Sequence, residues 1–282
     1  MTLAQDLVSS LRGQKFKTAF DLGLLDVGLS PEGKDWFVNN GVRVEPVKSD
    51  IDYPLREKWE AEKPGHRTLA ARPFLRTYFP GYDVYVWIDA DIWIQTPEAI
   101  NSLIEAAAQS SAIHMIVEFD RCYCRFFQHA GLWQIYHDWY KSIFGEDVAV
   151  GMTLKPMLNA GVFALSKDSP VWEGWRRIYT EVLQKATLEM PQNFMADQLG
   201  LNVILYLQNM PHVAMPAHFN WLTFHALLKF DPGTGLYVEP LPPYRPISQI
   251  HLTQPVKEQV ERIECLGGGF VERPLTYRAR RG

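Results

Sequence analysis

The sequence contains little cysteine, and this excludes one class of protein at once. Its 282 residues include three cysteines, Cys122, Cys124 and Cys265, too few for a disulfide framework. Cys122 and Cys124 form a C-x-C pair, but no second cluster of cysteine or histidine stands at zinc-site spacing. We therefore expect free thiols and a reducing compartment.

Long apolar runs and a strong net charge are also absent. No stretch reaches the roughly 18 uncharged apolar residues of a membrane span, and the N-terminal stretch has no signal-peptide core. The formal net charge is −4, whereas nucleic-acid-binding domains are usually basic. We expect a cytoplasmic protein with no nucleic acid partner and no transmembrane segment. The basic stretch 277–281 predicts a solvated end, with peripheral contact to an anionic membrane as the alternative.

What the sequence does contain is an alternation of strand and helix signals. Apolar, β-rich runs are separated by segments that begin at capping signals such as Ser30-Pro31 and Thr96-Pro97. This predicts an α/β fold with a mostly parallel sheet flanked by helices. No clear linker appears, so we expect a single domain over residues 1–282. The expected strands are 16–25, 42–47, 84–88, 112–119 and 158–165, and the main expected helices are 3–11, 67–79, 98–109, 132–144, 170–185 and 196–207.

Two carboxylates interrupt an otherwise apolar run, residues 84–94, which reads VYVWIDADIWI. A buried carboxylate needs a cation, hydrogen bonds or water, because an unpaired buried charge is costly. Asp89 follows the predicted strand, where parallel sheets bind ligands, and Asp91 lies two residues on, so both side chains can point to the same side. They can therefore share a divalent cation, with Mg²⁺ or Mn²⁺ preferred by oxygen ligands. By itself, D-x-D is also common in turns and caps.

Three further residues can complete such a site. His251 is a candidate third metal ligand, and Lys257 can reach a phosphate on the same metal. Arg72 offers a planar fork for a diphosphate. Each has a structural alternative, which is a core histidine, a solvated lysine or a surface ion pair.

Two more polar motifs follow in the sequence. Asn159-Ala-Gly161 places an amide and a glycine at the start of a predicted strand, where a turn is the alternative. Asp197-Gln198 lies on a predicted helix, where a charge near the helix N-terminus is the alternative.

Together these motifs resemble retaining glycosyltransferases of family 8, the type of glycogenin and of bacterial lipopolysaccharide galactosyltransferases. The resemblance extends from about Asp21 to Lys257. The residues that carry it are Arg72 with Leu75, Asp89-Ala90-Asp91, Asn159-Ala160-Gly161, Asp197-Gln198 with Leu201-Asn202, and His251 with Lys257.

The resemblance implies a GT-A fold and a hexosyltransferase that uses a nucleotide sugar, UDP-linked, and a glycan or lipid-linked acceptor, with retention. Asp89, Asp91 and His251 would then hold Mn²⁺ or Mg²⁺. Lys257 and the metal would neutralise the diphosphate, and Arg72 would also bind the donor. A cation at this position stabilises the departing diphosphate.

The same resemblance assigns catalytic residues. Asn159, Asp197 and Gln198 would line the sugar and the reacting face. Gln198 would be a polar stabiliser, and Asp197 is the second choice for a nucleophilic role. The aromatic-rich segment 121–140, which includes Phe126 and Phe127, either stacks on acceptor sugars or packs in the core.

This chain also departs from the family. The closing motif H-x-x-G-x-x-K-P-W has Gln254 in place of Gly and Glu258 in place of Pro. The first strand of the family, which holds the nucleobase, has no counterpart before the strand expected at 16–25. A non-catalytic nucleotide-sugar or glycan-binding protein on the same fold is therefore an alternative. A metal phosphohydrolase with Asp89 as nucleophile is a third, although Trp93 stands where haloacid-dehalogenase phosphatases have Thr or Val.

Overall fold

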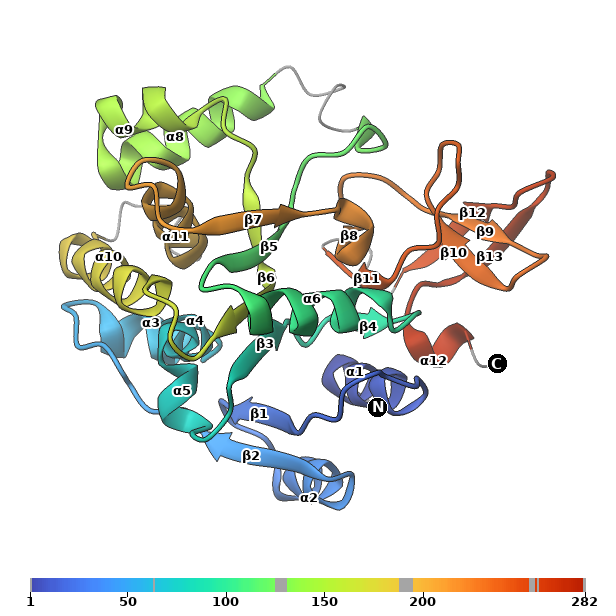
Figure 1. Cartoon of the computed structure of the whole chain (residues 1–282), viewed down its shortest axis with the longest axis horizontal. Coiled ribbons are helices and arrows are strands. Elements are labelled where there is room, and N and C mark those ends of the chain that lie inside the picture. The colour runs from blue at the N-terminus through green and yellow to red at the C-terminus, as the bar shows by residue number, and fades with distance from the viewer. Residues whose placement is uncertain are drawn as a thin grey trace.

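The computed structural model in Figure 1 describes residues 2–62, 64–124, 131–187, 195–253, 257 and 259–280. The predictions made for Phe126, Phe127, Gln254 and Glu258 lie outside these residues. No helix in the described ranges has the length and apolar character needed to cross a membrane.

One strand of the central sheet runs against the others. The order is β3 (Val84–Ile88), β6 (Leu158–Ser166), β5 (Ile113–Val117) and β7 (His212–Met215). β6 is antiparallel to both β3 and β5, whereas β5 is parallel to β7. Thus β3, β5 and β7 share one direction and β6 alone is reversed. The expected α/β class is confirmed, but the strand pairing is mixed and not mostly parallel.

The path of the chain between β5 and β6 explains the reversal. After β5 the chain makes an excursion that contains α8 (Leu132–Phe144) and α9 (Glu146–Met152), which lie together at the top of Figure 1. The chain then re-enters the sheet at the end where β5 finished, because Val117 pairs with Leu158. A single crossover helix would have returned it to the opposite end and made the two strands parallel.

Helices cover both faces of β6, which is buried from Leu158 to Leu165. On one side Val162 and Ala164 share a core with α6 (Glu98–Gln109). On the other side Phe163 packs edge-to-face on Trp172 and Trp175 of α10 (Val171–Lys185). The core around Phe163 also includes residues of α11 (Ala196–Tyr206).

The helix expected at 67–79 is divided into three pieces. These are α4 (His66–Ala71), the 3₁₀ turn η1 (Arg72–Phe74) and α5 (Leu75–Tyr78). Pro73 lacks a backbone N–H and cannot continue an α-helix from the preceding turn, which accounts for the break. The break places the Arg72 side chain in the interior, where 6% of the residue is exposed.

Smaller sheets surround the central one. β11 (Gln249–His251) is antiparallel to β4 (Ile92–Ile94) and parallel to β8 (Trp221–Leu222). β1 (Leu22–Asp26) pairs in parallel with β2 (Val42–Pro46), and no ladder within the described ranges joins this pair to β3. β1 is thus shorter than the strand expected at 16–25.

The other described elements include the basic segment near the C-terminus. The basic segment expected to be a solvated end instead forms α12 in residues 277–280, and Arg278 pairs with buried Asp6 at 3.1 Å. The remaining bounds are α1 (Leu3–Arg12), α2 (Pro31–Asn39), α3 (Arg56–Glu62), η3 (Ala217–Phe219), β9 (Lys229–Asp231), β10 (Leu236–Val238), β12 (Val260–Glu264), β13 (Phe270–Pro274) and α12 (Tyr277–Arg280).

Candidate metal centre

The structure brings together the three residues expected to bind metal. Asp89 and Asp91 lie in the short connection from β3 to β4, and His251 is the last residue of β11, opposite Ile92 of β4. The peptide N–H of Leu252 donates to the carbonyl oxygen of Asp91 at 3.0 Å, which ties β11 to this connection. One donor atom from each of the three side chains lies within 4.8 Å of the others.

Gly161 leaves the space between these side chains open. Its carbonyl oxygen accepts a hydrogen bond from the N–H of Asp89 at 2.8 Å, which continues the β3–β6 ladder into the site. A Cβ atom at Gly161 would lie 2.9 Å from Asp89 Oδ2 and 2.9 Å from His251 Cε1. Two carboxylates and an imidazole around such a cradle form a donor set that fits Mn²⁺ or Mg²⁺.

Two cationic or potentially cationic groups lie against Asp91. Lys257 Nζ is 2.6 Å from Asp91 Oδ2, and His251 Nε2 is 3.2 Å from Asp91 Oδ1. Burial works to raise the pKa of Asp91, but the hydrogen bonds and charges of His251 and Lys257 outweigh it and hold this pKa well below its usual value. Asp91 therefore stays ionised, as a metal ligand must.

Arg72 is shared between two carboxylates in the interior. Its guanidinium donates to Asp89 Oδ1 at 2.6 Å and to Asp197 Oδ2 at 2.7 Å, and it lies over the Trp87 ring at 5.1 Å. Trp87 Nε1 donates to the same Asp89 oxygen at 2.7 Å. These contacts leave Asp89 Oδ2 as the oxygen that faces Gly161. The arrangement differs from a surface ion pair because both Arg72 and Asp197 are buried.

The charges of this buried group depend on one another. Burial acts to lower the pKa of Arg72, but Asp89 and Asp197 outweigh it and raise that pKa. Burial raises the pKa of Asp197, and Arg72 opposes this change. Arg72 is therefore the charge that compensates Asp197 inside the protein.

The two candidate amides are held at both ends by the protein. Asn159 Oδ1 accepts from the N–H of Gly161 at 2.8 Å, and its Nδ2 donates to Glu118 Oε1 at 2.6 Å. Gln198 Oε1 accepts from the N–H of Ala160 at 2.8 Å, and its Nε2 donates to Glu118 Oε1 at 3.1 Å. Asn159 and Gln198 are both buried. Their hydrogen bonds hold the backbone of Ala160 and Gly161 in place beside Asp89.

Three residues of this site were not anticipated from the sequence. Glu118 follows β5 directly, and Glu118 Oε2 is 3.6 Å from His225 Nε2. Asn220 Oδ1 lies 3.1 Å from His251 Nδ1. The signal for Glu118 was available, because it is an acidic residue at the end of an apolar strand, like Asp89. No comparable signal marked Asn220.

Glu118 is ionised at neutral pH despite its burial. Burial works to raise the pKa of Glu118, but His225, Asn159 and Gln198 outweigh burial and lower that pKa. A carboxylate without a proton only accepts hydrogen bonds. The two amides must therefore present their NH₂ groups to it.

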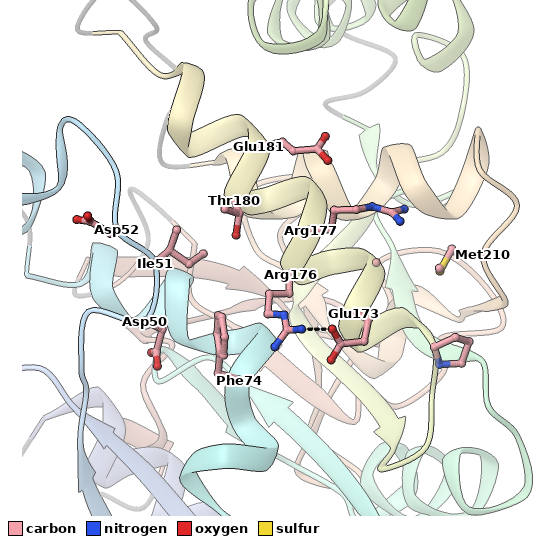
Figure 2. Close-up of a pocket in the computed structure, with 12 residues that line it drawn as sticks. Asp50, Ile51, Asp52, Phe74, Glu173, Arg176, Arg177, Thr180, Glu181 and Met210 are labelled. Carbon is pink, nitrogen blue, oxygen red and sulfur yellow. Dashed lines mark hydrogen bonds and ion pairs between the residues drawn. The ribbon is translucent and has the colours of Figure 1, made fainter.

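A separate groove lies on the outer side of α10. Its volume is about 740 Å³, and Figure 2 shows Phe74 and Ile51 on one side of it and the α10 residues on the other. Arg176 pairs with Glu173 and lies 5.8 Å from the centre of the Phe74 ring. Trp172 and Trp175 on the inner side of the same helix are fully buried, so a packed layer separates this groove from the carboxylates.

The structure resembles solved glycosyltransferases at low sequence identity. The WbbM bifunctional glycosyltransferase has 15% identity and a TM-score of 0.51, and the match covers 77% of this chain but only 37% of that one. An active-site mutant of LgtC has 15% identity and a TM-score of 0.50, with 88% and 82% covered. Mouse xyloside xylosyltransferase 1 has 13% identity and a TM-score of 0.50, with 88% and 90% covered.

These similarities establish the fold. The chain has a GT-A glycosyltransferase fold, in which mixed sheets are flanked by helices, as the sequence resemblance implied. Comparison of the sequence with family models and with curated proteins gives no match.

Proposed function

We propose that this chain is a metal-dependent glycosyltransferase. It would move a sugar from a nucleotide sugar, UDP-linked, to a glycan or lipid-linked acceptor, with retention at the anomeric carbon. The observation that carries this proposal is the convergence of Asp89, Asp91 and His251 around Gly161, with Lys257 on Asp91, in a GT-A fold.

The same geometry supports our proposal for the donor half of the site. Asp89 Oδ2, Asp91 and His251 Nε2 would hold Mn²⁺ or Mg²⁺. When bound, the cation would supply positive charge that stabilises the departing diphosphate. The Lys257 side chain is one-third exposed, so its ammonium group can turn from Asp91 to a diphosphate oxygen. Arg72 would act on the donor through Asp89, which it orients.

The sugar half of the site is proposed to contain Asn159, Asp197 and Gln198. Asp197 is 1% exposed and bound to Arg72, which supports a positioning role more than a nucleophilic one. Gln198 and Asn159 would act as fixed dipoles, since both are held by Glu118. Retention needs no protein nucleophile if the acceptor attacks the face that the diphosphate leaves, with a phosphate oxygen taking its proton.

Calorimetric titration of UDP, with and without Mn²⁺, tests this proposal. We expect Mn²⁺-dependent binding that is lost in Asp91→Asn. Asp83→Asn is the matched control, because Asp83 precedes the same strand at its opposite end and is an exposed partner of Lys167. An affinity for UDP that does not depend on Mn²⁺, or that is unchanged in Asp91→Asn, would contradict the proposal.

A non-catalytic nucleotide-sugar-binding protein is the second candidate. The observation that favours it is that both ends of the Asn159 and Gln198 side-chain amides are hydrogen-bonded to protein groups. Incubation with UDP-sugars, followed by assay of released UDP, separates the two, since a binding protein shows affinity without turnover. The phosphohydrolase reading has less support, because Asp89 Oδ1 is held by Arg72 and Trp87.

The setting of the reaction remains a prediction. The three free cysteines favour a cytoplasmic location. Peripheral membrane contact would suit a lipid-linked acceptor. Assay of the protein with and without anionic vesicles measures that contact directly.

A further inference from the structure

The indole of Trp87 lies against the first carboxylate of the candidate metal centre. Trp87 Nε1 donates to Asp89 Oδ1 at 2.7 Å, and Arg72 Nη2 donates to the same oxygen at 2.6 Å. The Arg72 guanidinium also lies over the indole, with its central carbon 5.1 Å from the ring centre. The three side chains therefore contact one another, and two N–H donors meet at one oxygen of Asp89.

The surroundings of Trp87 and Asp89 hold both groups in this arrangement. Trp87 lies in β3 opposite Phe163 of β6, and the two rings are nearly parallel, with an angle of 10° between them and 6.3 Å between their centres. The backbone of Asp89 is fixed as well, because its N–H donates to the carbonyl oxygen of Gly161 at 2.8 Å. Ring packing thus positions the indole, and a backbone hydrogen bond positions the carboxylate that it meets.

The two donors leave Asp89 with one oxygen for a cation. An indole N–H and a guanidinium can only donate, so Asp89 Oδ1 accepts from both. A carboxylate oxygen has about two lone-pair positions, and the hydrogen bonds from Trp87 and Arg72 fill those of Oδ1. The other oxygen, Oδ2, lies on the side of Gly161, where a Cβ atom would be 2.9 Å from it.

We propose that Trp87 is a positioning residue that makes Asp89 a one-oxygen ligand and thereby favours Mn²⁺ and Mg²⁺ over Ca²⁺. Ca²⁺ takes about six to eight oxygen ligands and often binds both oxygens of a carboxylate, whereas Mg²⁺ needs a nearly octahedral set. Mn²⁺ also occupies octahedral sites. Asp89 can offer both oxygens to one cation only if Oδ1 gives up the Trp87 N–H, and an N–H that loses its partner opposes this change. The inference rests on the proposed metal site and adds the feature that selects the ion.

The affinities for Mn²⁺ alone and for Ca²⁺ alone, measured by calorimetry, test this selection. Trp87→Phe keeps an aromatic ring beside Phe163 and removes the N–H donor. Loss of a partner of this kind typically weakens metal binding about 10–100-fold, and we expect a loss in this range for Mn²⁺. Ca²⁺ binding should be unchanged or tighter, because Asp89 can then offer a second oxygen. The ratio of the Mn²⁺ affinity to the Ca²⁺ affinity should therefore fall about tenfold or more.

Trp172→Phe is the matched control. The indole N–H of Trp172 donates to the carbonyl oxygen of Ser166 at 2.9 Å, and its ring packs edge-to-face on the same Phe163. This variant therefore loses an indole hydrogen bond beside the same ring but leaves the contacts of Asp89 in place, and it should keep both affinities. An equal fall of the affinity ratio in Trp172→Phe would indicate general loosening of β6 and would overturn the inference.

A second readout follows the indole N–H of Trp87 by NMR in ¹⁵N-labelled protein without UDP. The signal is identified by its loss in Trp87→Phe. In metal-free protein we expect its hydrogen to exchange with water more slowly than in Asp89→Ala, which lacks the acceptor. Addition of Mg²⁺, which is not paramagnetic, should leave this slow exchange unchanged, because the cation takes only Asp89 Oδ2.

Two further results would overturn the inference. One is an exchange rate of the Trp87 N–H that is the same in Asp89→Ala, or that becomes fast when Mg²⁺ binds. The other is an unchanged ratio of Mn²⁺ to Ca²⁺ affinity in Trp87→Phe. Failure of the inference is distinguishable from failure of the proposed function, because Mn²⁺-dependent UDP binding can succeed while this ratio stays unchanged. Absence of Mn²⁺ binding in the unmodified protein would overturn both.

Discussion

Arg72 is the residue whose replacement gives the sharpest energetic test of the buried site. Arg72→Met keeps an unbranched apolar chain at this position but removes the positive charge. Asp197, which is 1% exposed, then has no cation beside it. Asp89 is affected less, because its side chain is 25% exposed and Trp87 Nε1 still donates to it.

The size of the effect follows from what is left behind. Removal of one partner of a buried ion pair typically costs about 3–5 kcal/mol, because the other charge remains buried and uncompensated. Loss of the guanidinium from the Trp87 ring adds about 1 kcal/mol. Arg76→Met is the matched control one turn later. Its side chain is 35% exposed and pairs with exposed Glu173. It also donates to the Lys167 carbonyl and lies over the Trp172 ring at 5.4 Å, so we expect a loss of about 1–2 kcal/mol, without the cost of a buried unpaired charge.

Urea unfolding followed by tryptophan fluorescence, in EDTA, measures both variants. In Arg72→Met, burial without a partner raises the pKa of Asp197 further, so its charged form penalises the folded state. The penalty grows as pH rises from the ordinary aspartate pKa through this raised value. The stability gap to the unmodified protein should therefore be larger at about pH 8 than at about pH 5. Arg72→Met/Asp197→Asn should recover most of the loss.

Either of two outcomes would refute this reasoning. One is a loss in Arg72→Met no larger than that in Arg76→Met. The other is a double variant that is no more stable than Arg72→Met. Both would mean that Arg72 does not compensate Asp197.

Three further predictions concern other parts of the structure. Gly161→Ala puts a methyl group among the metal ligands and should weaken Mn²⁺ binding about tenfold or more in calorimetry. An unchanged affinity would contradict the claim that Gly161 leaves space for the cation. Burial raises the pKa of the Cys122 thiol to about 11, so only about one in a thousand is thiolate at about pH 8. Iodoacetamide should then label exposed Cys124 first, as peptide mapping will show, with Cys122 reacting faster only as pH rises; equal rates would argue against its burial. Asn202→Asp sets a carboxylate against the two backbone carbonyls that its NH₂ group now serves and should cost about 3 kcal/mol or more, seen as a lower unfolding temperature; an unchanged temperature would refute this.

Local signals predicted the elements whose formation depends on local sequence. The strand at 84–88 and the helices at 98–109 and 132–144 have the expected bounds, because apolar periodicity and turn residues determine them locally. The direction of β6 was not predictable in the same way. It depends on where a long excursion returns to the sheet, which no short segment records.

The candidate site likewise contains residues that the sequence indicates and residues that only the tertiary structure reveals. Residue types and their order suggested Asp89, Asp91 and His251, because metal ligands are chemically distinctive wherever they stand. Asn220 was invisible, since its contact with His251 depends on the pairing of β8 with β11. Pro73 is visible in the sequence, and it divides the helix expected at 67–79.

The reversed strand has a consequence for how the protein acquires its site while it folds. Because β6 lies between β3 and β5, it must insert before either neighbour gains its full set of backbone partners. Its pairing with β3 closes a long loop of chain, and such non-local closures slow folding. Asp89 meets Gly161 through that closure, at 2.8 Å between backbone N and O. A partly folded chain without β6 would have both carboxylates but no cradle, so the onset of cation binding during refolding should report the moment at which the sheet is completed.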